Sequence, residues 1–270
     1  MLLKGKKGLI IGVANDLSMA WGIAKLCHEH GAEIAMPYGI PALEKRVKPL
    51  AEQIGAKFVQ EMNVQNDAQM DDLFAAITKE WGHLDFVLHA VAFSDKNELN
   101  GMYANTTREN FKNTMDISVY SLVDITRRSM PLMKNGGSIA TLTYLGGERA
   151  IPNYNVMGVA KSALDSSVRY LAADLGGQNI RVNAISAGPI KTLASSGIGG
   201  FKSLLDVNAM LTPMRRNMTM EDVAGTALYM FSDLSSGVTG EVHHVDCGYN
   251  ATALLTTEVQ DMILNGDKAN

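Results

Sequence analysis

Short, strongly apolar segments alternate with longer segments of helical periodicity through most of this chain. Continuous apolar runs are typical of strands that are buried on both faces. We predict strands of this kind over Gly8–Ala14, Ala32–Pro37, Lys57–Met62, Leu84–Ala92, Gly137–Leu145, Ile180–Ser186 and Glu241–Val245. We predict helices between them over Met19–His30, Leu43–Ile54, Gln69–Trp81, Asn110–Asp116, Ile117–Met133, Asn155–Leu175 and Met220–Phe231.

This alternation favours a parallel sheet that helices cover on both faces. Because crossovers between parallel strands are right-handed, few topologies remain, and the doubly wound sheet is the commonest of them. No linker, repeat or change in composition divides the 270 residues. We therefore predict an α/β fold with a doubly wound, Rossmann-type parallel sheet, forming a single domain over residues 1–270.

Composition excludes several classes of protein. Apolar residues make up 46% of the chain and charged residues 19%, so it can bury a sizeable core. A formal net charge of −4 lacks the positive charge of a nucleic-acid-binding protein, so we expect no nucleic-acid partner. The chain has no run of about 20 apolar residues, and its charged N-terminus is unlike a signal peptide. We therefore expect no membrane contact and a cytoplasmic location.

Cysteine and histidine spacing argues against a metal site or a disulfide framework. Cys27 and Cys247 lie far apart without a CxxC motif, which favours two packed thiols in a reducing compartment. The pairs His28/His30 and His243/His244 place their rings on different faces of a helix or strand. We therefore expect no metal ion.

The turn after the first predicted strand has features of a phosphate-binding loop, although it lacks the GxGxxG motif. Gly12 permits a tight turn, Ser18 lies near the start of the next helix, and Gly22 would let helix and sheet approach closely. A helix N-terminus carries about half a positive charge, which suits a diphosphate. Glycine-rich turns without a ligand are also common, so this turn alone leaves dinucleotide binding open.

The ends of the second and third predicted strands leave NADH and NADPH as alternatives. NAD-binding sheets usually carry an acid at the end of the second strand for the ribose 2′-OH. This chain has Met36–Gly39 there, with neither an acid nor an adjacent arginine for a 2′-phosphate. Asn63 and Val64 close the third strand and could flank an adenine ring, or they could simply end a strand.

Tyr154 and Lys161 carry the clearest chemical signal. They are seven residues apart, which at about 100° per residue places both on one helix face, roughly 10 Å apart along the axis. Both could therefore reach one bound ribose–nicotinamide. A phenol with a pKa of about 10 is a donor at neutral pH, and a nearby ammonium would make it a better one. An amphipathic helix can carry such a pair incidentally, but its place after the fifth strand favours a catalytic role.

The segment Ile190–Met214 follows the sixth predicted strand, at the edge where ligands bind in such sheets. It contains Gly197, Gly199 and Gly200 and reads as one long loop. Long loops are more often functional than not. We therefore predict a substrate-binding segment over residues 190–214, with an ordinary loop as the alternative.

The sequence resembles the short-chain dehydrogenase/reductase superfamily and, within it, the bacterial NADH-dependent enoyl-[acyl-carrier-protein] reductases. The resemblance covers about residues 4–250 and rests on GVANDLSMAWGIA, HAVAFSDKNEL, TYLGGERAIPNYNVMGVAKSAL, RVNAISAGPIKTLASSGI and TGEVHHVDCGYN. It implies NADH as the cofactor, an enoyl thioester on acyl-carrier protein as the substrate, a place in fatty-acid elongation and a homotetramer.

The resemblance also implies site residues. The catalytic pattern of two tyrosines and a lysine matches Tyr144, Tyr154 and Lys161, and Ser94 joins the two tyrosines as a substrate contact. The implied cofactor-binding residues are Gly12, Ser18, Met19, Asn63, Val64, Val91, Lys161, Ile190, Lys191, Thr192, Leu193 and Ala194. The chain departs from the family's usual glutamine, aspartate, serine and glycine at Gly39, Asn63, Ala90 and Ala92.

We expect Tyr154 to donate a hydrogen bond to the developing enolate oxygen and Lys161 to hold the cofactor ribose, while Tyr144 lines the acyl pocket or only packs. One alternative is a carbonyl or alcohol reductase in which Thr141, thirteen residues before Tyr154, polarises the substrate carbonyl. Tyr144 and the wide Tyr–Lys spacing argue against it. A second alternative is a catalytically silent dinucleotide-binding protein, which the presence of Tyr154 and Lys161 disfavours.

Overall fold

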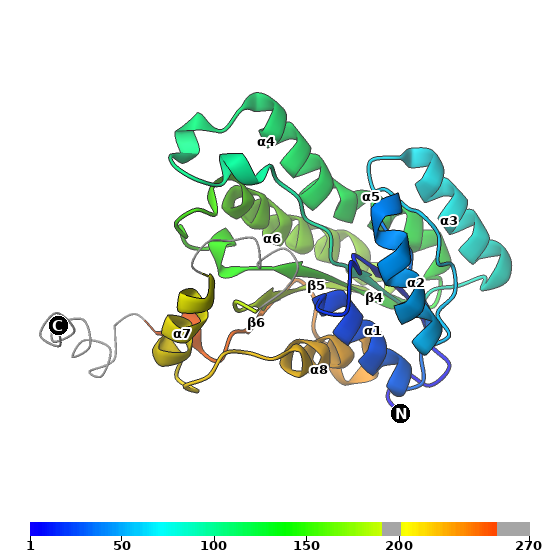
Figure 1. Ribbon diagram of the computed structural model, residues 1–270. Coiled ribbons are helices and arrows are strands. Elements are labelled where there is room, and N and C mark those ends of the chain that lie inside the picture. The colour runs from blue at the N-terminus through cyan, green and yellow to red at the C-terminus, as the bar shows by residue number, and fades with distance from the viewer. Residues whose placement is uncertain (191–200, 253–270) are drawn as a thin grey trace, which may run out of the picture.

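The computed structural model describes residues 1–190 and 201–252, and Figure 1 shows their arrangement. Within these residues, six strands form one sheet in the order β2-β1-β3-β4-β5-β6. The strands are β1 (Lys7–Ile11), β2 (Glu33–Ala35), β3 (Phe86–His89), β4 (Gly137–Thr143), β5 (Ile180–Ala187) and β6 (Val242–Val245). All neighbouring strands are parallel, so their carboxyl ends lie at the same edge.

Helices cover both faces of this sheet (Figure 1). They are α1 (Met19–Glu29), α2 (Glu44–Gln53), α3 (Asp67–Glu80), α4 (Arg108–Met115), α5 (Ser121–Ser129), α6 (Asn155–Leu175), α7 (Phe201–Leu211) and α8 (Met220–Phe231). Side chains of α1, α2 and α8 form an apolar cluster with one face of the sheet. Side chains of α3, α5 and α6 form a second cluster with the other face.

Burial on both faces explains why the strands are continuously apolar in sequence. Successive side chains of a strand point to opposite faces. In β1, Ile10 packs in the cluster that includes α1, whereas Leu9 and Ile11 pack in the cluster that includes α3. The predicted α/β fold, a doubly wound parallel sheet with helices on both faces, is confirmed.

The predicted strand Lys57–Met62 is wrong. This segment runs parallel to the end of β2 but makes only the isolated bridges Ala35↔Lys57 and Tyr38↔Glu61. Phe58 has a positive φ of 53°, a conformation that extended strands do not contain. The apolar pattern placed this segment beside the sheet correctly, but the left-handed backbone conformation at Phe58 keeps it from forming a regular strand.

The helical segment after β3 is less regular than predicted. The predicted helices Asn110–Asp116 and Ile117–Met133 correspond to α4, one π-helical turn over Asp116–Tyr120, and α5. Single π-turns inside longer helices are frequent at functional sites. By contrast, α6 and α8 have the predicted bounds.

The segment predicted as one long loop, Ile190–Met214, contains the helix α7. Apolar residues in this helix recur at helical spacing, whereas the glycines that suggested a loop all precede it. Residues 191–200 lie outside the described residues, and with them the predicted cofactor contacts Lys191, Thr192, Leu193 and Ala194.

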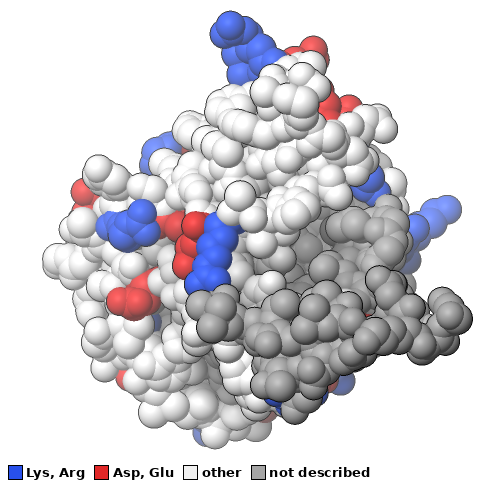
Figure 2. Space-filling view, turned by 90° about the vertical axis from the view of Figure 1, so that its left-hand side faces the viewer, with Lys and Arg blue, Asp and Glu red and all other residues white. Residues whose placement is uncertain are grey.

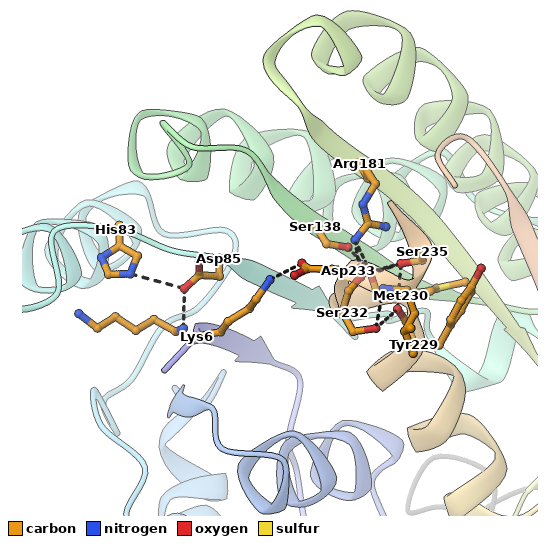
Figure 3. A network of polar contacts seen from close by, with 12 residues as sticks. Lys6, His83, Asp85, Ser138, Arg181, Tyr229, Met230, Ser232, Asp233 and Ser235 are labelled. Atoms are coloured by element: carbon orange, nitrogen blue, oxygen red, sulfur yellow. Dashed lines mark hydrogen bonds and ion pairs between the residues drawn. The ribbon is translucent and has the colours of Figure 1, made fainter. Parts of the chain in front are cut away.

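Polar contacts close the amino edge of the sheet, opposite the predicted site (Figure 3). The Arg181 guanidinium donates hydrogen bonds to the backbone oxygens of Met230 at 2.7 Å and Ser232 at 3.3 Å, where α8 ends. Ser138 in β4 donates to the same Met230 oxygen at 2.7 Å. These donors satisfy carbonyl groups that lack partners within the helix, so they fasten α8 to the sheet.

No helix within residues 1–190 and 201–252 is long and apolar enough to cross a membrane. In the same part of the chain, no group of three or more His, Cys, Asp or Glu side chains could hold a metal ion. Cys27 and Cys247 are buried free thiols, in keeping with the packed thiols that the sequence predicts.

Candidate active site

The predicted site residues converge on the carboxyl edge of the sheet. The register pairs Ile11 with His89 and His89 with Thr141, so the turns after β1, β3 and β4 are neighbours. The chain crosses from β1 to β2 on one side and reaches β3 on the other. Doubly wound sheets bind ligands at such a switch point, outside the carboxyl ends of the strands.

The turn after β1 is shaped for close approach. Gly12 has a φ of +107°, and a Cβ there would lie 2.1 Å from the backbone oxygen of Ala90, so only glycine fits. The Ser18 hydroxyl accepts hydrogen bonds from the backbone N–H groups of Ala14 and Asn15, both at 3.0 Å. These contacts close the loop directly before α1, whose N-terminus favours negative charge.

Gly22 serves a different contact from the predicted one. A Cβ at this position would lie 2.3 Å from Cγ of Met220, so glycine lets α1 pack directly on α8 rather than on the sheet. Met19 and Ile190 are partly buried and pack against the same apolar cluster. Both therefore lie on the face of the sheet that carries α1.

Asn63 and Val64 lie on the other face of the sheet, beside the end of β2. The Asn63 carboxamide oxygen accepts a hydrogen bond from the backbone of Gln65 at 3.0 Å. Val64 and Val91 both pack against the cluster that includes α3, so the loops that carry them share one apolar support. The Gln65 side chain in turn donates to Asp116 at 2.8 Å, linking this loop to the π-helical turn.

The side chains of Tyr144 and Tyr154 meet edge to face, with ring centroids 5.1 Å apart and planes at 78°. Tyr144 follows β4, and Tyr154 directly precedes α6. Gly146 makes this position possible, because a Cβ there would lie 2.4 Å from the Tyr154 ring. Neither phenol oxygen has a hydrogen-bond partner among the described residues, so both can serve a ligand.

Burial raises the pKa of both phenols above the usual value for tyrosine, so both are protonated donors at neutral pH. After burial, Tyr144 and Asp165 raise the pKa of Tyr154 further. Lys161, whose ammonium is predicted to make this phenol a better donor, is not among the groups that shift the pKa of Tyr154. The low polarity around the ring outweighs any stabilisation of the phenolate.

Lys161 is buried in α6, and its Nζ donates a hydrogen bond of 2.7 Å to the backbone oxygen of Leu142 in β4. Burial lowers its pKa to about 8, and Asp165, one helical turn further on, acts in the opposite direction. The amine is thus held at the sheet edge and is still mostly charged at neutral pH.

Sequence analysis missed the role of His89, a polar residue inside an otherwise apolar strand. It is wholly buried, with Nδ1 2.8 Å from the Thr141 hydroxyl and Nε2 2.7 Å from the Ser121 hydroxyl. Ser121 donates its proton to the backbone oxygen of Ile117, so it accepts from Nε2, and Thr141 donates to Nδ1. Burial and then Lys161 lower the pKa of His89 to about 3, which keeps the ring neutral.

Thr141 and Ser94 both have hydrogen-bond partners within the protein. The Thr141 hydroxyl is wholly buried and bonded to His89, so it is not placed to polarise a substrate carbonyl. Ser94 is also buried, and its hydroxyl exchanges hydrogen bonds with the Asn110 carboxamide at 3.1–3.3 Å. The Ser94 side chain therefore fastens the loop after β3 to α4.

Figure 2 shows the side of the molecule that carries α7, the helix that follows the end of β5. Charged side chains form only small groups on the described part of this face, and most of its surface is uncharged. Such a surface does not concentrate the positive charge that attracts a polyanion.

The chain matches the family model described as Enoyl-(Acyl carrier protein) reductase over residues 12–250. The enoyl-[acyl-carrier-protein] reductase [NADH] FabI of Rickettsia felis is 59% identical over 92% of this chain and 96% of the relative. Enoyl-[acyl-carrier-protein] reductase [NADH] 1 of Rhizobium meliloti is 55% identical over 97% of this chain and 96% of the relative.

Solved structures that resemble this chain are also enoyl-(acyl-carrier-protein) reductases. The enoyl-(acyl-carrier-protein) reductase of Anaplasma phagocytophilum, in complex with NAD, has a TM-score of 0.92 and 55% identity. That comparison covers 95% of this chain and 98% of the other. FabI of Candidatus Liberibacter asiaticus has a TM-score of 0.92 and 51% identity over 94% of this chain and 99% of the other. The chain belongs to the enoyl-(acyl carrier protein) reductase family.

Proposed function

We propose that this protein reduces the double bond of a trans-2-enoyl thioester carried by acyl-carrier protein, with NADH as the reductant, during fatty-acid elongation. The observation that carries the proposal is the contact between Tyr144 and Tyr154 at the start of the helix that bears the buried Lys161. Relatives that are 49–59% identical and named NADH-dependent reductases of this substrate support it.

The residues at the sheet edge fit a dinucleotide. Glycine at position 12 lets the turn after β1 pass close to the backbone of Ala90, and the Ser18 hydroxyl closes that turn directly before α1, whose N-terminus favours a diphosphate. We place the adenine beside Asn63 and Val64, and the remaining cofactor contacts at Met19, Val91, Lys161 and residues 190–194. When bound, the reduced nicotinamide supplies the hydride that the β-carbon of the substrate receives.

Tyr154 stabilises the charge that develops on the thioester oxygen. Its phenol is protonated and has no protein partner among the described residues, so it is ready to donate a hydrogen bond to that oxygen. A donor of this kind typically lowers the barrier by about 3–4 kcal/mol. Tyr144 packs edge-on against the ring and keeps it in place, and the two tyrosines with the backbone at Ser94 form the substrate contact.

Lys161 holds the cofactor ribose. Its bond to the Leu142 oxygen fixes the amine at the sheet edge, and its remaining protons can bind ribose hydroxyls. The buried ammonium also adds positive charge next to the reacting carbonyl group.

A panel of substrates tests the proposal. The protein is mixed with NADH or NADPH and offered an enoyl thioester and then ketones, while nicotinamide absorbance is followed. We expect oxidation of NADH with the enoyl thioester and not with ketones, because Thr141 is bonded to His89. Turnover with ketones alone would identify a carbonyl reductase, and no turnover would identify a catalytically silent nucleotide-binding protein.

We also propose that the protein is a homotetramer that pairs through the α5 and α6 side of the sheet. Large apolar side chains are exposed on that side: Tyr120, Val123, Val159 and Tyr170. Exposed apolar groups that cluster on adjacent helices commonly mark an interface. Sedimentation velocity should give a mass about four times that of the chain, and a monomeric mass would contradict the assembly.

A further inference from the structure

Asn155 makes hydrogen bonds that the proposed reaction does not use. It is the first residue of α6 and the direct neighbour of Tyr154. Its Nδ2 donates to the backbone oxygens of Leu99 at 3.0 Å and Gly101 at 3.2 Å, and it lies 3.5 Å from the Glu98 oxygen. One side-chain amide thus binds the backbone carbonyl groups of a single segment, residues 98–101.

The loop that contains this segment is also fastened to α4. The Glu98 carboxylate accepts hydrogen bonds from the backbone N–H and the hydroxyl of Thr107, both at 2.8 Å. Thr107 caps α4, and Asn110 in that helix accepts from the backbone N–H of Asp95 at 3.0 Å. Asn155 therefore joins a loop held by α4 to the helix that bears Lys161.

The backbone at the start of α6 also depends on asparagine. Both neighbours of Tyr154 have a positive φ, 59° at Asn153 and 37° at Asn155. Asparagine tolerates this region better than most residues, but it remains unfavourable and persists only where the surroundings impose it. Hydrogen bonds to the 98–101 segment offset that cost at Asn155, whereas the exposed Asn153 side chain has no hydrogen bond with a described residue.

We propose that Asn155 is a positioning residue, whose carboxamide fastens residues 98–101 beside Tyr154 so that they form a fixed wall of the enoyl-thioester site. This inference rests on the proposed function, because the wall matters only for a substrate that approaches Tyr154. Ser94, the implied substrate contact, belongs to the same loop between β3 and α4.

Two variants distinguish the effect of the Asn155 side chain from the effect of its backbone conformation. Asn155→Gly accepts the positive φ but removes the amide, whereas Asn155→Asp keeps the size and points an acceptor at three carbonyl oxygens. Asn153→Gly is the matched control, since it changes an asparagine with a positive φ two residues away. Each variant is digested with trypsin under native conditions, and the initial cleavage rate after the exposed Lys96 is measured.

Loss of two hydrogen bonds should raise that cleavage rate about tenfold in Asn155→Gly, more in Asn155→Asp, and not in Asn153→Gly. The KM for the enoyl thioester should rise about tenfold in Asn155→Gly, while the Kd for NADH changes less than about twofold. Unchanged cleavage, an equal increase in the Asn153→Gly control, or faster cleavage with an unchanged KM would overturn the inference. A wild-type protein that fails to reduce the enoyl thioester would contradict the proposed function instead, and the cleavage rates would still test the tether.

Discussion

The Nζ atom of Lys161 lies 2.7 Å from the backbone oxygen of Leu142, so the strand that leads to Tyr144 fixes the amine of the helix that follows Tyr154. This contact sets the amine at the carboxyl edge of the sheet, next to the switch point between β1 and β3. Lys161 and the two tyrosines thereby depend on one another for their positions.

Lys161→Ala should weaken NADH binding about 10–100-fold, because hydrogen bonds from a charged donor contribute about 1.5–3 kcal/mol each. Fluorescence titration with NADH measures this change. Lys161→Arg is the control, because it keeps the positive charge but changes the geometry of the donor. An unchanged Kd in Lys161→Ala would show that the amine does not hold the cofactor.

The same lysine should make stability depend on pH. Burial lowers the pKa of Lys161 to about 8 in the folded protein, whereas an unfolded chain titrates near 10.4. Between these values the unfolded chain binds more protons, so the unfavourable contribution of this group is full below about pH 8 and is lost as the pH rises toward 10.4.

Relative to Lys161→Met, the wild-type protein should therefore gain about 3 kcal/mol in free energy of unfolding across that pH window. Urea denaturation of both proteins at a series of pH values measures the difference. A difference that does not vary with pH would mean that the amine is not desolvated in the folded state.

Tyr154→Phe should lower kcat about 10²–10³-fold and leave the Kd for NADH nearly unchanged. The reason is that the phenol acts on the developing charge, whereas phenylalanine keeps the edge-to-face contact with Tyr144. Single-turnover kinetics with saturating NADH isolates the chemical step. A full rate in this variant would remove Tyr154 from the reaction.

Thr141→Val should destabilise the protein without slowing the reaction. The substitution leaves the buried Nδ1 of His89 without its donor, at a cost of about 1–3 kcal/mol in free energy of unfolding. Thr141→Ser keeps the hydroxyl and is the control. If Thr141→Val folded with normal stability but lost activity, Thr141 would contact the substrate, as a carbonyl reductase requires.

Arg181→Ala should also act on stability alone, because its guanidinium binds carbonyl groups at the end of α8, at the edge of the sheet opposite the site (Figure 3). We expect a loss of about 1–3 kcal/mol in free energy of unfolding and an unchanged kcat. Ser138→Ala, which removes one donor to the same Met230 oxygen, should show a smaller loss. Equal stability of Arg181→Ala and wild type would show that this contact does not hold α8.

The fold followed from sequence wherever one local pattern decided the structure. Apolar runs identified the strands of the sheet, and the bounds of α6 and α8 matched because their helical patterns are long and uninterrupted. Lys57–Met62 failed because the positive φ at Phe58 leaves no mark in an apolar pattern. The helix α7 was missed because the glycines that precede it led to the prediction of a loop over the whole segment.

The site was predictable only in part, for a related reason. Tyr154 and Lys161 lie close in sequence, so helical spacing revealed them. The partners of His89 are 52 and 32 residues away, and those of Asn155 are 54 to 57 residues away. Such contacts depend on the register of distant elements, which a single sequence does not show.

The most direct measurement is the identity of the product formed from a trans-2-enoyl thioester on acyl-carrier protein in the presence of NADH, determined by mass spectrometry beside the loss of NADH absorbance. We predict one saturated acyl thioester for each NADH consumed, and a rate that falls about 10²–10³-fold in Tyr154→Phe. An unreacted enoyl thioester, or NADH consumption that leaves the double bond intact, would contradict the account.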